Sequence, residues 1–532
     1  MYSPFSNILH TSAVPSPAEC QQIQELLRGP RQEITRLQRL IDEATQKRDE
    51  LQHFVDAHTA LLSSARRLPD DILSEIFVAC LAPTRNPAFC ADQSPLLVSH
   101  ISTNWRRVAL STPRLWASMH IAVPDQSRLD RLTEQVSLWL SRSGAVPLSI
   151  SLALSQTASW TPDGLCDISS LLSILLAESR RWRNIHFSVS NAASNFFIPQ
   201  LTAADVPLLH SMSFSNDISY GARTGTPVDV SHPPLSFLGT DSLRSLTTSV
   251  YSLDLHAPGA VSWYTLVHLK LEMETHGGIT HSSALHVLSQ CHFLEYCVIP
   301  LYRRTARDSP LAASVAHFTL PYLTELRLEV LGQAYDQHTK FFSCISLPAL
   351  RYFEFKGGSI SNVNSDPRLL RECFFPQDLS SLEQLEVEVA RLPQAVFLNM
   401  LPEMTSLQKL HMTRELSSEQ PVDGDTLMHT SELLVQLTVP DTGDVVLPQL
   451  RQLDLGTFRN QPAQQIVAFV QSRRVASRVG VAQLERFSGR LDRVSGIEVL
   501  EKLGDEVAEG LDINLRYTGI TPPQYSPMEG IL

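Results

Sequence analysis

One short pattern runs through most of this chain, and four of its copies are LPYLTELRL (320–328), LPALRYFEF (347–355), LSSLEQLEV (379–387) and LPQLRQLDL (447–455). In each copy an apolar residue is followed by further apolar residues three and five positions later. Apolar side chains at alternate positions are typical of a short strand with one buried face. Such a strand needs neighbours to cover that face, so the copies are expected to pack against one another in a continuous core.

The pattern recurs on average about every 28 residues, within the roughly 20–29 residues of leucine-rich repeats, which this region resembles. The asparagine that usually follows the last leucine of such a repeat is missing from the four copies. We therefore expect an irregular α/β solenoid over residues 119–516, with helices such as 169–179 and 283–290 between its strands. The positions that begin a copy are Trp182, Leu209, Leu243, Leu266, Leu294, Leu323, Leu350, Leu382, Leu407, Leu434 and Leu450.

Both ends of this array have their own predicted pattern. It begins with apolar alternation at 119–123, an amphipathic helix at 127–142 and a second alternating strand at 146–154. A strand, a helix and a strand over some 35 residues predict a parallel βαβ unit. From residue 461 onward we expect two helices and one strand, at 511–515, which together form a C-terminal cap.

A different kind of sequence precedes the array, opening with LPDDILSEIF (68–77) and closing with NWRRVALSTPRLW (104–116). It predicts two amphipathic helices joined by a loop, the first starting at Pro69 and the second after Pro95. Two such helices cannot close a large core alone, so they need cover from the rest of the chain or from another protein. The expected apolar seam is Ile72, Leu73, Ile76 and Phe77 in the first helix and Leu97, Ile101, Trp105 and Val108 in the second.

These residues resemble the F-box, over residues 65–118. The resemblance rests on the leading Leu-Pro, the Ile-Leu-x-x-Ile-Phe helix, the Trp-Arg-Arg-Val-Ala block and the closing Pro-Arg-Leu-Trp. Ile101-Ser102 stands where the family commonly has Val-Cys, and 82–94 resembles an insertion. In F-box proteins this segment docks on the Skp adaptor of a cullin ubiquitin ligase. The adaptor-binding residues implied here are Leu68, Pro69, Ile72, Leu73, Ile76, Phe77, Leu97, Ile101 and Trp105.

The alternative for this segment is an ordinary helical hairpin buried under the first repeat. An intermediate interpretation has part of the face bind the adaptor while another part packs inward and joins the segment to the array. The residues concerned in that case are Trp105, Val108, Leu115 and Trp116.

Residues 18–64 predict a coiled coil after a disordered lead at 1–17. A short helix over 18–28 is expected to stop at Gly29-Pro30, and a second helix follows. Apolar residues recur in that second helix with a 3.5-residue period, interrupted by Arg48 and His58. Either the helix forms a homodimer, or it packs back on its own short partner or on the F-box. The apolar seam positions are Ile34, Leu37, Ile41, Ala44, Leu51, Val55 and Leu62.

Composition excludes several classes of protein. The net charge of −12 disfavours non-specific binding to nucleic acid or to an anionic membrane. No apolar run reaches the ~18 residues of a membrane span, and the N-terminus is unlike a secretory signal. The eight cysteines are scattered and contain no C-x-x-C pair, so reduced thiols are expected. A cytoplasmic or nuclear protein fits these features, and the tail at 517–532 is predicted to be disordered.

No catalytic or cofactor-binding motif is present, so we expect neither an enzyme nor a cofactor. Cys291-His292 with Cys297 comes nearest to a metal site, but Cys297 occupies an apolar repeat position and predicts a core thiol. His100, in the second F-box helix, is expected to be a surface or adaptor-facing residue rather than an acid–base catalyst. Two basic clusters could bind acidic or phosphorylated motifs, although solvent-exposed surface charge is the default interpretation of both. They are Arg180, Arg181 and Arg183, and Arg303, Arg304 and Arg307.

The resemblance implies a substrate receptor of a Skp–cullin–F-box ubiquitin ligase, whose F-box binds the adaptor and whose repeats bind a protein substrate. The alternative is a non-catalytic scaffold in which the F-box-like hairpin is structural and the coiled coil drives self-assembly. A hydrolase or transferase with an unrecognised site is the third and weakest hypothesis. Adaptor binding separates the first two.

Overall fold

The computed structural model describes residues 3–123, 128–154, 168–189, 198–216, 235–249, 260–272, 278–302, 316–331, 341–357, 375–376, 378–388, 394–413, 430–440, 442–456, 463–474, 480–491 and 493–517. The chain divides into two compact units, Met1–Ala79 and Cys80–Leu532. Residues 3–16 of the lead lie in turns and extended segments. The tail after residue 517 lies outside the described residues.

The first unit contains the helix α1 (Pro17–Leu62), a short 3-10 turn (Ser64–Arg67) and the helix α2 (Asp70–Ala79). The predicted break at Gly29-Pro30 is wrong, because α1 continues through Pro30 as one helix of 46 residues. An internal proline removes one helical N–H. Leu26, four residues earlier, is 44% exposed, so water can bond the carbonyl that loses its partner. The chain therefore offers one long helix where two were expected.

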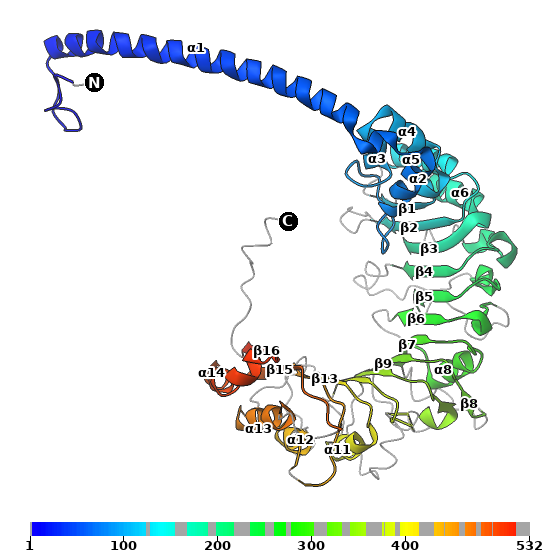
Figure 1. Ribbon diagram of the computed structural model, residues 1–532. Helices are drawn as coiled ribbons and strands as arrows, with labels where there is room; N and C mark the ends of the chain where they lie inside the picture. The colour runs from blue at the N-terminus through cyan, green and yellow to red at the C-terminus, as the bar shows by residue number, and fades with distance from the viewer. Residues whose placement is uncertain are drawn as a thin grey trace, which may run out of the picture. The chain divides into compact units, whose positions relative to one another are not determined.

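The second unit is built on a sheet of 14 parallel strands in its described part. The strands lie side by side in the order of the sequence (Figure 1), apart from β8 (Phe318–Thr319) and β10 (Ile345–Ser346), which pair separately. The members of the large sheet are β1 (Ser118–Val123), β2 (Leu148–Leu154), β3 (Trp182–Val189), β4 (Ser211–Asn216), β5 (Ser245–Ser249), β6 (His268–Glu272), β7 (Tyr296–Tyr302), β9 (Glu325–Leu331), β11 (Tyr352–Gly357), β12 (Gln384–Glu388), β13 (Lys409–Thr413), β14 (Gln452–Leu455), β15 (Arg486–Leu491) and β16 (Asp512–Tyr517).

Helices connect these strands, and those between β1 and β15 lie along one side of the sheet (Figure 1). Parallel strands require such crossover connections. The chain is thus a mixed α/β protein with a long N-terminal helix. The helices of the second unit are α3 (Leu96–Ile101), α4 (Thr103–Leu110), α5 (Leu129–Arg142), α6 (Ser169–Ala177), α8 (His281–Leu288), α11 (Gln394–Met400), α12 (Thr430–Leu437), α13 (Ala463–Arg474), α14 (Arg493–Lys502) and α15 (Gly504–Ala508).

The predicted βαβ unit is confirmed at the start of the sheet. β1 and β2 pair in parallel, and α5 between them buries Leu129, Leu132, Val136 and Trp139. α5 ends before Gly144, whose φ of +55° lies in the left-handed region that glycine adopts at no steric cost.

Every predicted position that begins a copy is buried, each with 1% exposure or less. Ten of them begin or closely precede a strand, which confirms the strand prediction there. Leu434 is the exception, because it lies in α12. Leu433, Leu434 and Leu437 are all buried at helical spacing, and Leu450 precedes the next strand instead.

The C-terminal region continues the sheet further than predicted. The strand expected at 511–515 is present as β16, but β15 between α13 and α14 was missed. In β15 the inward position that is apolar in the other clear copies is Gly489, which hides the alternation.

Candidate interaction surfaces

The predicted apolar face of α2 divides into two sets of residues. Leu73 and Phe77 are buried, with exposures of 1% and 0%, whereas Ile72 and Ile76 expose 46% and 40%. Leu68 is half-buried and Pro69 is exposed; the Pro69 carbonyl accepts a 3.0 Å hydrogen bond from the Leu73 N–H. α2 therefore presents an exposed pair of isoleucines one helical turn apart.

The predicted second helix of this segment is two helices, so the expected continuous seam is wrong. Ser102 is extended (φ −157°, ψ 165°), and its hydroxyl caps α4 by accepting a bond from the Trp105 N–H at 3.2 Å. This turn separates Leu97 and Ile101, which expose 45% and 57%, from Val108, which is buried. Trp105 is half-buried. α3 therefore presents a second exposed apolar pair, Leu97 and Ile101.

The end of the segment packs inward, as the intermediate interpretation predicted for Val108, Leu115 and Trp116. The Trp116 Nε1–H donates a 2.8 Å bond to the Ala109 carbonyl. Its ring lies edge-on to Trp139 of α5, with centroids 4.9 Å apart. These contacts attach α4 to the start of the sheet.

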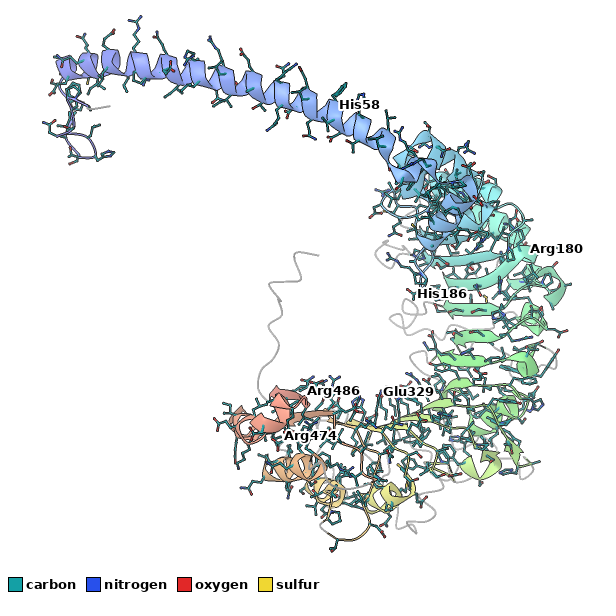
Figure 2. All side chains as sticks on the ribbon, in the orientation of Figure 1. His58, Arg180, His186, Glu329, Arg474 and Arg486 are labelled. Atoms are coloured by element: carbon teal, nitrogen blue, oxygen red, sulfur yellow. The ribbon has the colours of Figure 1, made fainter. Side chains whose placement is uncertain are left out.

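The predicted coiled-coil seam of α1 is exposed along its whole length. Exposure of its large apolar residues runs from 46% at Leu37 to 79% at Leu62, and Ala44 is exposed as well. Figure 2 shows the side chains of α1 projecting around the helix, among them His58. The interpretation in which the helix packs on its own short partner is wrong, because that partner is part of the same helix.

Three rows of mostly polar side chains run across the strands on the side of the sheet opposite the buried apolar side chains. We call each row of paired positions a register and this side the polar face. His186 and Glu329 lie on it, whereas Arg180 lies on the side of the helices (Figure 2). Over β1 to β5 this face, the neutral half, has no Asp, Glu, Lys or Arg at these registers. Its residues are Ser118, His120, Ala122, Ser149, Ser151, Ala153, Asn184, His186, Ser188, Ser211, Ser213, Ser215, Ser245, Thr247 and Ser249.

From β6 to β14 the same registers form the charged half. It contains six glutamates, one aspartate, three lysines and one arginine among its described positions. Those residues are Lys270, Glu272, Glu325, Arg327, Glu329, Glu354, Lys356, Glu386, Glu388, Lys409 and Asp454.

In the neutral half, hydroxyl, amide and imidazole groups of adjacent strands bond to one another. His120 Nδ1 lies 2.9 Å from Ser151 Oγ, and the Asn184 amide donates to Ser149 Oγ at 3.0 Å. Burial, and then the nearby His186, lower the pKa of His120. This part of the face offers hydroxyls and imidazoles to a partner.

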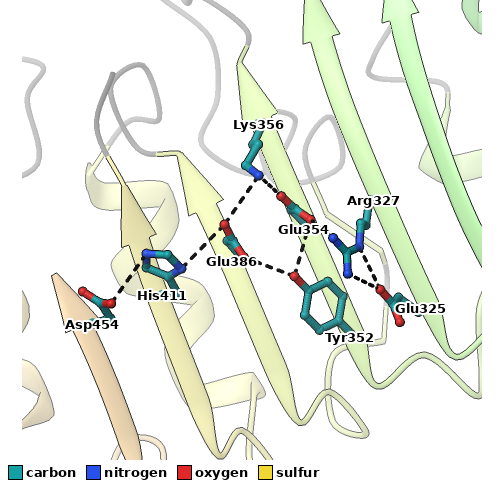
Figure 3. Close-up of polar contacts among 8 residues, drawn as sticks. All are labelled: Glu325, Arg327, Tyr352, Glu354, Lys356, Glu386, His411 and Asp454. Atoms are coloured by element: carbon teal, nitrogen blue, oxygen red, sulfur yellow. Dashed lines mark hydrogen bonds and ion pairs between the residues drawn. The ribbon is translucent and has the colours of Figure 1, made fainter. Parts of the chain in front are cut away.

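In the charged half, Glu354 is the buried centre of an ion-pair network (Figure 3). It is only 4% exposed and bonds to Arg327 Nη1 at 3.2 Å and to the Lys356 ammonium. Burial alone would lower the pKa of Lys356, but the hydrogen bonds and charges of Glu354 and Glu386 together outweigh it and raise that pKa. Arg327 also bonds to Glu325 at 2.6 Å. A buried carboxylate requires such partners, so the network fixes these side chains across two neighbouring strands, β9 and β11.

The network continues to β14 through weaker contacts. Tyr352 donates its hydroxyl hydrogen to Glu386 at 3.1 Å, and burial, with Glu354 and Glu386 nearby, raises the pKa of Tyr352. His411 lies between two carboxylates, 3.6 Å from Glu386 and 3.8 Å from Asp454 (Figure 3). All these residues share two adjacent registers of the polar face.

A shallow hollow of about 290 Å³ lies over β11 to β15 on this face. Glu386 and Asp454 line it together with Lys409, His411 and Arg486. The buried Asp454 Oδ1 has no hydrogen-bond partner among the described residues. Ligand pockets for small molecules are mostly apolar. The lining of this hollow is instead mixed, with carboxylates, cations and an imidazole among its residues.

The predicted basic clusters have different fates. Arg181 donates to the Val146 carbonyl at 2.9 Å and to Ser143 Oγ at 2.6 Å, so it anchors the end of α5. Arg180 and Arg183 are exposed, and Trp182 between them is a core residue, as predicted. The cluster of Arg303, Arg304 and Arg307 lies outside the described residues.

Cys297 is a core thiol, as predicted. Cys291 and Cys297 are fully buried, and burial raises the pKa of the Cys291 thiol to about 12. His292 and His100 are exposed. Within the described ranges no three His, Cys, Asp or Glu side chains are grouped to bind a metal ion. Nor is any helix there both long and apolar enough to cross a membrane.

No protein-family model matches the chain, and no curated protein sequence matches it. Among solved structures, the crystal structure of a structural genomics target from Bacteroides fragilis is similar at 11% identity, over 75% of this chain and 73% of that chain. The TM-score is 0.22. A score of this size does not indicate a shared fold, so this likeness supports no statement about fold or function.

Proposed function

We propose that this chain is the substrate-recognition subunit of a Skp–cullin–F-box ubiquitin ligase. In this proposal residues 65–118 are the F-box and residues 119–516 form an irregular leucine-rich-repeat-like solenoid. The observation that carries the proposal is the exposed pair Ile72 and Ile76 within the F-box-like LPDDILSEIF. Isolated apolar side chains on a surface are ordinary, but paired ones on a motif that resembles an adaptor-binding helix support docking.

The second exposed pair, Leu97 and Ile101 on α3, belongs to the same F-box-like sequence and supports the same role. The buried residues of the same segment have a different role from the exposed pairs. Leu73 and Phe77 on α2 are buried, as is Val108 on α4, whereas the two exposed pairs are available to the Skp adaptor.

The sheet would hold the substrate. A long row of parallel strands presents polar side chains at constant spacing, which suits binding of an extended protein surface. The chain would have no catalytic role of its own. It would raise the effective concentration of the substrate near the catalytic subunits of the ligase, in the cytoplasm or nucleus.

A pull-down with purified Skp adaptor tests the proposal. Wild-type protein should bind, and Ile72→Asp/Ile76→Asp should lose binding by at least tenfold, because two charges would be desolvated at the contact. Leu138→Asp is the matched control, since Leu138 is an equally exposed residue (51%) on α5. Circular dichroism checks the fold of each variant. Failure of wild type to bind, or unchanged binding by the double variant, contradicts the proposal.

The second candidate function is a non-catalytic coiled-coil scaffold with a structural F-box-like hairpin. The exposed seam of α1 favours it, because self-assembly would cover that seam. A protein that self-associates but does not bind the adaptor would support the scaffold over the receptor.

A further inference from the structure

The exposed apolar stripe of α1 is wider than a coiled-coil seam. Beside the seam, Leu40, Phe54 and Leu61 expose 47%, 61% and 60%. If Ile34 is position a of a heptad, these three residues occupy position g, where the one interruption between them is Lys47. Contiguous exposed apolar surface marks an interaction site. The helix therefore needs a partner that covers positions a, d and g together.

The seam alone does not determine the orientation of that partner. Ile34, Ile41 and Val55 at a, with Leu37 and Leu51 at d, are also typical of parallel dimers. In a parallel pair, however, position g faces position e. Positions e are polar, since they are Gln38, Thr45, Gln52 and Thr59.

A parallel pair would therefore leave the g residues poorly covered. Leu40 would face the partner's Thr45 and Phe54 the partner's Thr59. Arg48 would also face the partner's Arg48 in the seam, where two like charges repel.

The stripe is nearly palindromic about residue 46. Counting outward from this point in both directions, Ile41 corresponds to Leu51 and Leu37 to Val55. Leu40 and Phe54 lie symmetrically about residue 47, one position further along. In an antiparallel pair, a faces d and g faces g, so Ile41 meets the partner's Leu51 and Leu40 meets the partner's Phe54. The polar contacts are Ile34 with His58, Leu61 with Glu33, and Lys47 with the partner's Lys47 at the edge of the seam. Arg48 then lies beside the small Ala44, close to its own Asp49, to which it bonds at 2.5 Å.

We propose that α1 binds α1 of a second copy of this chain in antiparallel orientation, with Ile41 opposite the partner's Leu51. The partner is another copy because the apolar residues of α1 match those of the same helix running in the opposite direction. In this arrangement the two Leu62 residues lie about 48 Å apart, at 1.5 Å per residue, and leave the pair at opposite ends. The proposal goes beyond the adaptor-binding function and does not depend on it.

Cysteine cross-linking of the full chain tests the orientation. Ile41→Cys and Leu51→Cys are made separately, with different affinity tags, in a background where Cys20, Cys80 and Cys90 are serine. The two proteins are mixed and oxidised. The expected result is the mixed disulfide between the two variants, at least tenfold above either homodimeric disulfide, because only facing residues come within bonding distance.

A matched control pair of cysteines tests whether cross-linking depends on the apolar stripe. Arg39→Cys mixed with His53→Cys has the same spacing about residue 46 but lies on the outer face of the helix, so it should not cross-link. Homodimeric disulfides of Ile41→Cys or Leu51→Cys would show a parallel pair and overturn the proposal. A monomer by sedimentation at 50–100 times the concentration used for cross-linking would also overturn it, leaving a different protein as the partner.

Discussion

The neutral and charged halves of the polar face share one backbone and one buried surface, yet they carry different chemistry. Phe187 of β3 and Phe355 of β11 occupy the same inward register, and both are buried. On the polar face, Ser213 of β4 and Arg327 of β9 occupy the same outward register. The repeat constrains mainly the inward positions, so the outward ones can differ between the halves.

The difference extends below the surface. Among the described residues, buried polar side chains up to β5 are serines and threonines, whereas His281, Glu354, Arg473 and Arg474 are buried further along. Arg473 donates to the carbonyls of Leu437, Val446 and Leu447, and burial lowers its pKa to about 10. The second half therefore depends on specific polar partners that the first half does not need.

The largest expected effect tests whether the two halves are equal in their core. Phe187→Ala and Phe355→Ala should each destabilise the protein by roughly 3–5 kcal/mol, because both remove a fully packed ring. Urea denaturation gives the total loss. Hydrogen exchange of β3 and β11 amides localises it, since stacked units depend mainly on their neighbours. A loss less than half as large for Phe187→Ala would mean that the halves are not packed alike.

The next largest effect is expected on acidification, through the buried His281 in the second half. Burial lowers the pKa of His281 to about 4, so the unfolded chain binds a proton there before the folded one does. Stability present above about pH 6.5 is therefore lost as the pH falls toward 4, by roughly 1.36 kcal/mol per unit and about 3 kcal/mol in total.

His281→Gln should flatten that part of the stability curve, measured by urea denaturation from pH 8 to pH 4. Circular dichroism at pH 8 confirms that the variant is folded. An unchanged slope in the variant would show that His281 is not the group that titrates.

A smaller effect is expected on the polar face itself. Arg327→Ala removes one partner of the buried Glu354 and should cost about 1–3 kcal/mol, because Lys356 and Tyr352 remain. Ser213→Ala at the same register in the neutral half should stay within about 0.5 kcal/mol. Pairing Arg327→Ala with Glu354→Gln isolates the interaction in a double-mutant cycle. Equal losses of stability in Arg327→Ala and Ser213→Ala would remove the distinction between the halves.

Much of the fold was predictable from local periodicity. Alternating apolar residues located most strands, as in β1 and β2, and a 3.5-residue period located the exposed stripe of α1. Periodicity failed where one residue broke it. Gly489 concealed β15, and Leu434 fitted a strand pattern within α12.

The candidate surfaces were only partly predictable. The motif at 68–77 singled out α2, but only the structure distinguishes exposed Ile72 and Ile76 from buried Leu73 and Phe77. The network around Glu354 was missed altogether. Its one sequence signal is the run of charged residues between the apolar positions of LPYLTELRL, LPALRYFEF and LSSLEQLEV.

The sequence by itself determined which residues avoid water, because apolar spacing follows directly from helix and strand geometry. Tertiary structure alone decided which polar residues meet. Arg327 and Glu354 are 27 positions apart, and they pair only because the register of β9 against β11 places them side by side. Sheet register depends on the packing of whole connections, which no short stretch of sequence contains.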